Sequence, residues 1–162
     1  MTIAVGDRIP SISLYHVVDG KIAVLGSDDL LRDKRSVIFA VPGAFTPTCS
    51  EQHLPGFVTN AYTFKKKGID QVVCISVNDA FVMRAWQQDQ AILEEVVMMS
   101  DGNGEFTEAL GLTLDLRGAG MGVRSKRYAM VVESGVVTHL FVEPTGGGLA
   151  VSRAEVVLEA LG

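Results

Sequence analysis

The residue of this sequence best suited to chemistry is a cysteine at the start of a predicted helix. Residues 36–41 form a short apolar run rich in β-branched residues, which is typical of a buried strand. Pro42 ends this strand, Thr46 is a good N-cap, and Pro47 suits the first helical position. Cys49 then lies in the first turn of the helix, where free N–H groups and the helix dipole favour a thiolate.

A free cysteine is otherwise most often a small buried hydrophobe. The strand, the Pro-Gly break and the helix start around Cys49 favour a reactive thiol instead. A dithiol motif of the form Cys-x-x-Cys would need a cysteine at position 46, where this chain has Thr46. We therefore expect Cys49 to attack something other than a protein disulfide.

Other residues are candidates to assist this thiol. His53 follows Cys49 by four positions and shares its helical face. Three roles are open for it: a base that takes the proton of the Cys49 thiol, a residue that positions other groups of the site, or an ordinary surface histidine. Arg124 and Arg127 are both potential counter-charges, and Arg124 directly follows a glycine-rich loop that would let it fold inward. Cys74 lies in an apolar run and is expected to be a core cysteine.

Length and composition restrict the class of protein. The 162 residues suggest a single domain, and the net charge of −5 argues against nucleic acid as a partner. Two cysteines do not make a disulfide scaffold, and they fit a reducing compartment. No signal peptide and no membrane-spanning run is apparent, so we expect a soluble, cytoplasmic protein with no membrane partner.

No cofactor and no metal is expected. The glycine-rich loop over 118–122 lacks the third glycine of a dinucleotide fingerprint, and a strand follows it rather than a helix. Residues 101–105 resemble the start of a calcium loop, but the glycine and the closing glutamate are missing. Cys49, His53 and Cys74 match no usual closed zinc site.

The order of predicted elements indicates an α/β fold. Strands are expected over 11–18, 21–25, 36–41, 72–77, 94–99, 112–116, 124–132 and 136–143. Helices are expected over 27–33, 49–67 (bent at Pro55), 80–90 (with Phe81, Ala85 and Trp86 toward the core), 105–110 and 151–161. The βαβ units require right-handed parallel crossovers, whereas the last hairpin is antiparallel. This predicts a thioredoxin-like fold, with a mixed central sheet flanked by helices and an N-terminal β-hairpin extension.

The sequence resembles the peroxiredoxins. The pattern Pro42-x-x-x-Thr46-x-x-Cys49 matches their active-site signature, and the segments 42–50, 74–82 and 122–128 resemble type II plant and bacterial members and type V animal members. The resemblance covers nearly the whole chain. It implies a thioredoxin-like fold, thiol-dependent reduction of hydrogen peroxide and alkyl hydroperoxides, and a homodimer.

The same resemblance implies roles for individual residues. Cys49 matches the peroxidatic cysteine, Thr46 and Arg124 match the polar pair around it, and Pro42 matches the residue that shields it. His53 remains a candidate that acts through these residues. Thr46, Arg124 and the backbone N–H groups of residues 44–49 are expected to hold the peroxide in line for attack.

The second cysteine of the catalytic cycle is not where animal type V members carry it. Their resolving cysteine follows a Glu-Pro loop, but residues 143–152 contain no thiol here. Cys74 matches the second cysteine of type II members, and pairing it with Cys49 would require local unfolding. We therefore expect a one-cysteine cycle in which an external thiol, glutathione with glutaredoxin or thioredoxin, reduces the sulfenic acid.

Two other functions stay open at this point. A redox-sensing or chaperone-like protein on the same fold would use oxidation of Cys49 to change its assembly. A thiol–disulfide oxidoreductase is the other alternative, against which the absence of Cys-x-x-Cys counts.

Overall fold

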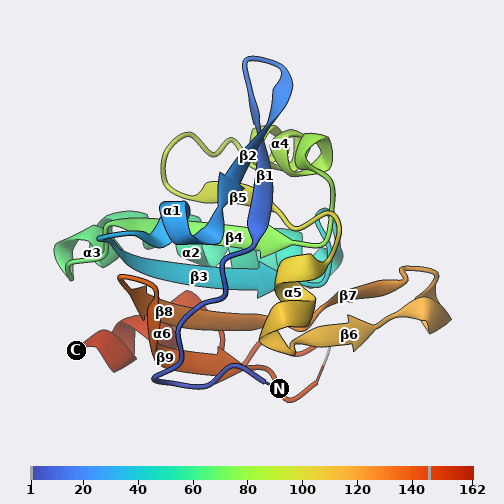
Figure 1. Ribbon diagram of the computed structural model, residues 1–162. Coiled ribbons are helices and arrows are strands. Elements are labelled where there is room, and N and C mark those ends of the chain that lie inside the picture. Colours follow the sequence, from blue (N-terminus) through green and yellow to red (C-terminus); the bar gives the residue numbers. More distant parts are fainter. Residues whose placement is uncertain (1, 146) are drawn as a thin grey trace.

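A seven-stranded mixed sheet forms the centre of the protein. The computed structural model describes residues 2–145 and 147–162, and its strand order is β2-β1-β5-β4-β3-β8-β9 (Figure 1). The strands are β1 (Ser13–Val18), β2 (Lys21–Gly26), β3 (Arg35–Val41), β4 (Gln71–Ser76), β5 (Val97–Ser100), β8 (Tyr128–Glu133) and β9 (Val136–Val142). The pairs β3–β4 and β4–β5 are parallel, and the other pairs are antiparallel. The expected mixed sheet with an N-terminal hairpin is confirmed.

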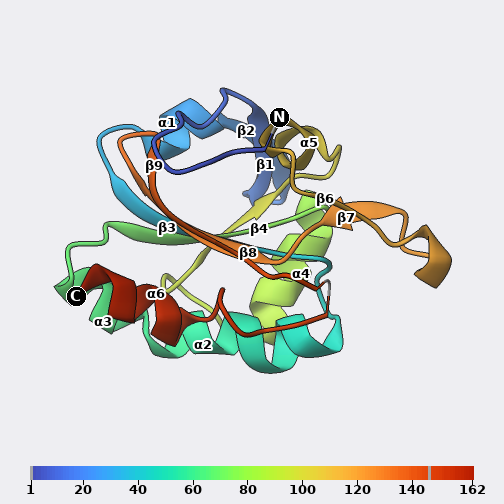
Figure 2. The ribbon, with the colours of Figure 1, turned by 90° about the horizontal axis from the view of Figure 1, so that it is seen from below.

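Helices cover both faces of this sheet (Figure 2). One face carries α1 (Ser27–Leu31) and α5 (Glu105–Leu110). The other carries η1 (Cys49–His53), α2 (Leu54–Thr59), α3 (Ala61–Lys66), α4 (Ala80–Asp89) and α6 (Ala154–Leu161). Each face has its own apolar cluster, so the strands between the two layers are buried on both sides. Within the described parts of the chain, no helix has the length and apolar character needed to span a membrane.

Strand β3 shows why the sequence before the active-site turn is a continuous apolar run. Val37, Phe39 and Val41 belong to the cluster under α2, whereas Ile38 and Ala40 belong to the opposite cluster. All five side chains are fully buried, as expected for a central strand of a parallel pair. The strand therefore leads from the middle of the core directly to the turn that precedes Cys49.

The helix after this turn is not the single bent helix expected over 49–67. It opens with a π-type turn, η1, in which the Leu54 N–H bonds to the carbonyl of Cys49. Pro55 follows at once, and because it has no N–H it cannot continue a regular ladder. A second interruption lies at Asn60, between α2 and α3, where the side-chain amide donates to the Gly56 carbonyl at 2.8 Å.

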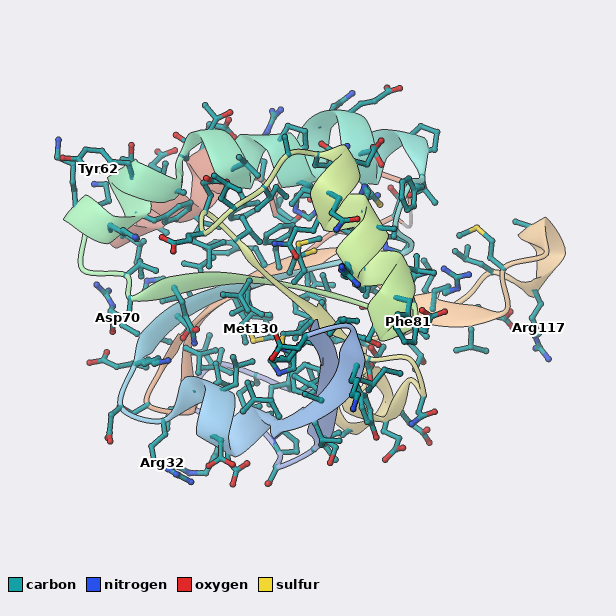
Figure 3. All side chains as sticks on the ribbon, turned by 90° about the horizontal axis from the view of Figure 1, so that it is seen from above. Arg32, Tyr62, Asp70, Phe81, Arg117 and Met130 are labelled. Atoms are coloured by element: carbon teal, nitrogen blue, oxygen red, sulfur yellow. The ribbon has the colours of Figure 1, made fainter. Side chains whose placement is uncertain are left out.

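The strand expected over 124–132 is also divided. Residues Val123–Ser125 form β7, which pairs with β6 (Thr113–Asp115) in a separate two-stranded ribbon. The 3₁₀ turn η2 (Arg117–Ala119) closes this ribbon, and Figure 3 shows Arg117 at its outer end, pointing away from the body. The chain then turns before β8 begins, with the Lys126 N–H donating to the Leu112 carbonyl at 2.8 Å. Arg127 lies in this break between the two strands.

Smaller differences concern the boundaries and the face of α4. Strand β5 begins at Val97 rather than at residue 94, and α6 begins at Ala154 rather than at 151. On α4, Trp86 is buried as expected, but Phe81 is half exposed and Ala85 is exposed, while Met83 takes the core position.

The expected end of the helix at Gly68 is confirmed and gives a stability prediction. Gly68 has φ +88°, and the Ile69 N–H bonds to the Phe64 carbonyl at 3.1 Å, as in a Schellman cap. Gly68→Ala should lower the free energy of unfolding by about 1–2 kcal/mol, because a Cβ is strained in the left-handed region. Urea denaturation measures this. Gly118→Ala, whose added Cβ meets nothing within 4 Å, is the control, and an equal loss there would contradict the explanation.

Candidate active site

The turn between β3 and the helix brings the signature residues together. Phe45 adopts a left-handed φ of +64°, and the Ser50 N–H bonds to the Thr46 carbonyl at 2.9 Å, so the helix starts where expected. The Thr46 hydroxyl donates to the Gly43 carbonyl at 2.7 Å and thereby closes the turn, instead of making a capping bond to the helix. Its oxygen keeps lone pairs that can accept hydrogen bonds from a substrate.

Cys49 is a buried free thiol in contact with a buried arginine. The Arg127 Nη2 donates to the Cys49 Sγ at 3.1 Å, and both residues are almost completely inaccessible to solvent. The sequence offers two arginines as counter-charge and favours Arg124. The structure instead places Arg127 on the sulfur.

Arg124 lies at the edge of the same site with a different set of contacts. Its Nε donates to the Met121 carbonyl at 2.8 Å, and its Nη1 donates to the Pro42 carbonyl at 3.2 Å. A Cβ added at Gly43 would lie 2.9 Å from Arg124 Nη1, so this approach requires the glycine. Arg124 therefore ties the β6–β7 ribbon to the active-site turn, and its guanidinium does not have the thiol contact expected for it.

His53 lies behind the arginine rather than on the thiol. Its Nδ1 is 3.0 Å from Arg127 Nη1, and its Nε2 is 3.0 Å from the carbonyl oxygen of Ser152. Because a carbonyl only accepts, Nε2 carries the proton and Nδ1 accepts from Arg127. Burial lowers the pKa of His53 to about 3, so the ring is neutral at pH 7.

Cys74 is buried in the middle of β4, in the same apolar cluster as Cys49. Burial, with a smaller contribution from Cys49, raises the pKa of the Cys74 thiol well above its usual range. The thiol therefore stays protonated near neutral pH. This position matches that expected of a core cysteine, and a resolving role remains a prediction.

Residues outside the turn that precedes Cys49 also fix its conformation. The Asn78 Oδ1 accepts from the Ala44 N–H at 2.9 Å and from the Ser76 hydroxyl at 2.6 Å. Trp86 Nε1 donates to the hydroxyl of Ser50, the residue after Cys49, at 3.0 Å. Sequence reasoning misses this role of Asn78, because nothing local signals its contact with Ala44, which is 34 positions away.

The buried neutral His53 predicts a stability that depends on pH. Below pH 6.5 the His53 side chain is protonated in the unfolded chain, but in the folded chain it takes up a proton only near pH 3. The free energy of unfolding therefore decreases as the pH is lowered from about 6.5 towards 3. For His53 this amounts to about 2 kcal/mol between pH 7 and pH 5. His53→Gln should flatten the dependence by this amount in urea denaturation. His16→Gln, at a half-buried position on β1, is the control, and an unchanged slope in His53→Gln would refute the assignment.

Comparison with known proteins shows which family the chain matches. A model of the Redoxin family matches residues 4–158. The chain is 50% identical over 164 residues to "Peroxiredoxin-2E, chloroplastic" of Arabidopsis thaliana, covering 99% of this chain and 70% of the relative. It is 45% identical over 161 residues to Peroxiredoxin-2B of the same plant, covering 98% of both.

Among solved structures, reduced Prx3 of Vibrio vulnificus in complex with hydrogen peroxide superposes with a TM-score of 0.94. It is 46% identical, and the match covers 99% of this chain and 100% of that chain. The fold is thus shared with known relatives over almost the whole of this chain. The chain belongs to the redoxin family and, within it, to the peroxiredoxins of the type 2 and type 5 group.

Proposed function

We propose that this peroxiredoxin reduces hydrogen peroxide and alkyl hydroperoxides with Cys49 as the attacking thiol. Thiol-dependent peroxidase activity is the activity of the relatives that it matches over nearly its whole length. The observation that carries the residue assignment is the contact of 3.1 Å between Arg127 Nη2 and Cys49 Sγ in the first turn of a helix. The solved complex of reduced Vibrio vulnificus Prx3 with hydrogen peroxide supports the same substrate class.

The chemical step transfers one oxygen atom to sulfur. The Cys49 thiolate attacks one peroxide oxygen, so that an S–O bond forms as the O–O bond breaks. Cys49 is oxidised to the sulfenic acid, and the other oxygen leaves with the electron pair as hydroxide or alkoxide. Protonation of this oxygen yields water or an alcohol.

Thiolate formation by itself explains little of a fast rate. A free thiol with a pKa of about 8.5 is roughly 3% thiolate at pH 7. Lowering such a pKa to about 6 gives roughly 30 times more thiolate, but nucleophilicity falls about 10-fold, so the net gain is only about threefold. Most of the acceleration must therefore come from groups that stabilise the transition state.

Arg127 and Thr46 are the candidates for such groups in this proposal. Arg127 has one further buried donor, Nε, that has no hydrogen-bond partner among the described residues. The Thr46 oxygen can accept a hydrogen bond from the peroxide while its own proton is held by Gly43. One well-placed donor to a developing charge is worth about 2.7–4 kcal/mol. Pro42 is buried at the start of this turn, and we assign it the role of shielding the sulfur from water.

The sulfenic acid is reduced by an external thiol in this proposal. Cys74 lies fully buried within a strand that is paired on both sides, and we expect its pairing with Cys49 to require local opening of β4. Glutathione with glutaredoxin, or thioredoxin, then completes a one-cysteine cycle. The alternative, a redox-sensing or chaperone-like protein, differs by lacking turnover with any added thiol.

A homodimer and a cytoplasmic location complete the proposal. Large apolar side chains at Phe45, Phe81 and Val123 are about half exposed, and a second copy of the chain would cover them. Two free thiols fit a reducing compartment such as the cytoplasm.

Replacing the arginines one at a time separates their roles. Arg127→Lys keeps the charge but loses the fork that spans Cys49 and His53, so the second-order rate constant with hydrogen peroxide should fall about 100-fold. Arg124→Lys changes only the bonds to the Met121 and Pro42 carbonyls and should lose less than about 10-fold. Stopped-flow measurement of peroxide reduction decides between them. If the rate constant fell further in Arg124→Lys than in Arg127→Lys, Arg124 and not Arg127 would be the arginine that stabilises the transition state.

The two cysteines are tested by turnover. Cys49→Ser should abolish peroxide consumption with every reductant, because it removes the atom that is oxidised. Cys74→Ser should keep turning over with glutathione and glutaredoxin or with thioredoxin, and the faster system identifies the reductant. A Cys74→Ser enzyme that stops after one turnover would show that Cys74 resolves the sulfenic acid.

A further inference from the structure

A closed ring of hydrogen bonds begins and ends at Arg127. The Glu143 N–H donates to the Arg127 carbonyl at 2.9 Å, and the Glu143 carboxylate accepts from the N–H of Ser152 at 2.7 Å. The Ser152 carbonyl then accepts from His53 Nε2 at 3.0 Å. His53 Nδ1 finally accepts from Arg127 Nη1, also at 3.0 Å. Residues from separate parts of the chain thus fix one guanidinium.

Glu143 is the anchor of this ring. It is a buried carboxylate that collects the backbone N–H groups of Ala150, Val151 and Ser152, together with the Ser152 hydroxyl at 2.6 Å. Burial by itself would raise the pKa of Glu143, but the bonds from Ser152 and its neighbours outweigh this and lower the pKa below its usual range. The carboxylate is therefore charged at neutral pH, and it orders the turn over 150–152.

The ring fixes the hydrogen-bonding state of His53. With Nε2 donating to the Ser152 carbonyl, Nδ1 can only accept, so the imidazole presents a lone pair to Arg127. If the Ser152 carbonyl moved away, the His53 proton could occupy Nδ1. Two N–H donors, from His53 and Arg127, would then point at each other and could form no hydrogen bond. The direction of the Ser152 carbonyl therefore decides whether His53 can accept the hydrogen bond from Arg127 Nη1.

The ring also leaves the positive charge of Arg127 without a carboxylate partner. Among residues 2–145 and 147–162, no ion pair joins Arg127 to an Asp or Glu, and the Glu143 oxygens are occupied by backbone N–H groups and a hydroxyl. The neutral His53 orients the guanidinium without neutralising it. The charge thus remains directed at the Cys49 sulfur, which Nη2 contacts.

We propose that Glu143 is a positioning residue for the reaction of Cys49, acting through Ser152 and His53 to hold the Arg127 guanidinium on the sulfur. This inference rests on the proposed function of Cys49 and Arg127. A merely structural Glu143 would tie down the turn over 150–152 and change stability alone. A positioning Glu143 changes the reactivity of Cys49 in the folded protein.

The test compares two glutamates that lie close in sequence. Glu143→Gln removes the charge and leaves an amide N–H group facing the N–H donors of the turn. Glu155→Gln makes the same change at an exposed position on α6, where the side chain only pairs with Arg153. Both are made in the 162-residue Cys74→Ser protein, which leaves Cys49 as the one cysteine of the sequence. The readouts are the pH profile of Cys49 alkylation by iodoacetamide and the rate constant with hydrogen peroxide.

For Glu143→Gln we expect the alkylation profile to move to higher pH and the peroxide rate constant to fall about 10-fold or more. Glu155→Gln should leave both unchanged. Ser152→Ala removes only the hydroxyl donor, and a smaller shift in the same direction is expected, which keeps the test valid if Glu143→Gln folds poorly. The titratable groups around the thiol in these measurements are Arg127 and His53, with Glu143 behind them.

A double variant identifies the route. In an Arg127→Lys background, Glu143→Gln should cause no further loss, because both changes act on one guanidinium. Additive losses, or an unchanged alkylation profile in both Glu143→Gln and Ser152→Ala, would overturn the inference. Alkylation does not depend on peroxidase activity. A protein that fails to reduce peroxide but keeps the shifts in alkylation would therefore refute the proposed function and not the ring.

Discussion

The contact between a buried guanidinium and a buried thiol is the constraint on which the active site depends. Removing an arginine from water costs several kcal/mol unless its donors are satisfied. Arg127 meets this with the Cys49 sulfur at 3.1 Å and the His53 ring at 3.0 Å. The Nε donor is also buried and has no partner among the described residues. Two donors of the guanidinium are thus fixed on the sulfur and the imidazole in the absence of substrate, which is the kind of preorganisation that stabilises developing charge.

Two irregularities of the backbone serve this contact. Strand pairing is interrupted between β7 and β8, and Arg127 lies in this interruption rather than in the middle of a strand. The π-type turn η1 carries both Cys49 and His53, the two partners of the guanidinium. π-turns often occur at functional sites, where they alter the facing of side chains. A regular strand and a regular helix would present these groups differently.

Local sequence signals predicted one half of the site and tertiary contacts determine the other half. The strand, the turn and the position of Cys49 follow from β-branched runs, proline and a helix cap, which act within about ten residues. The choice between Arg124 and Arg127 could not be made in this way. Three positions apart on one continuous strand, the two arginines would point to opposite faces. The interruption between β7 and β8, where the Lys126 N–H bonds to the Leu112 carbonyl, is a tertiary feature that no local pattern indicates. The contact of His53 with Ser152 spans 99 positions and has no local signal.

The neutral imidazole of His53 accepts a hydrogen bond from Arg127 without opposing its positive charge, which can therefore act on the Cys49 sulfur. A carboxylate in the place of His53 would bind the guanidinium more strongly, but its negative charge would also weaken the electrostatic stabilisation that Arg127 can give to a thiolate. The imidazole supplies geometry with little opposing field, and burial keeps it neutral well below pH 7. The negative charge of Glu143 is placed beyond the ring, where it orders the Ser152 turn through N–H donors. In this arrangement, orientation and charge are provided by different residues, so the charge of Arg127 remains directed at the Cys49 sulfur.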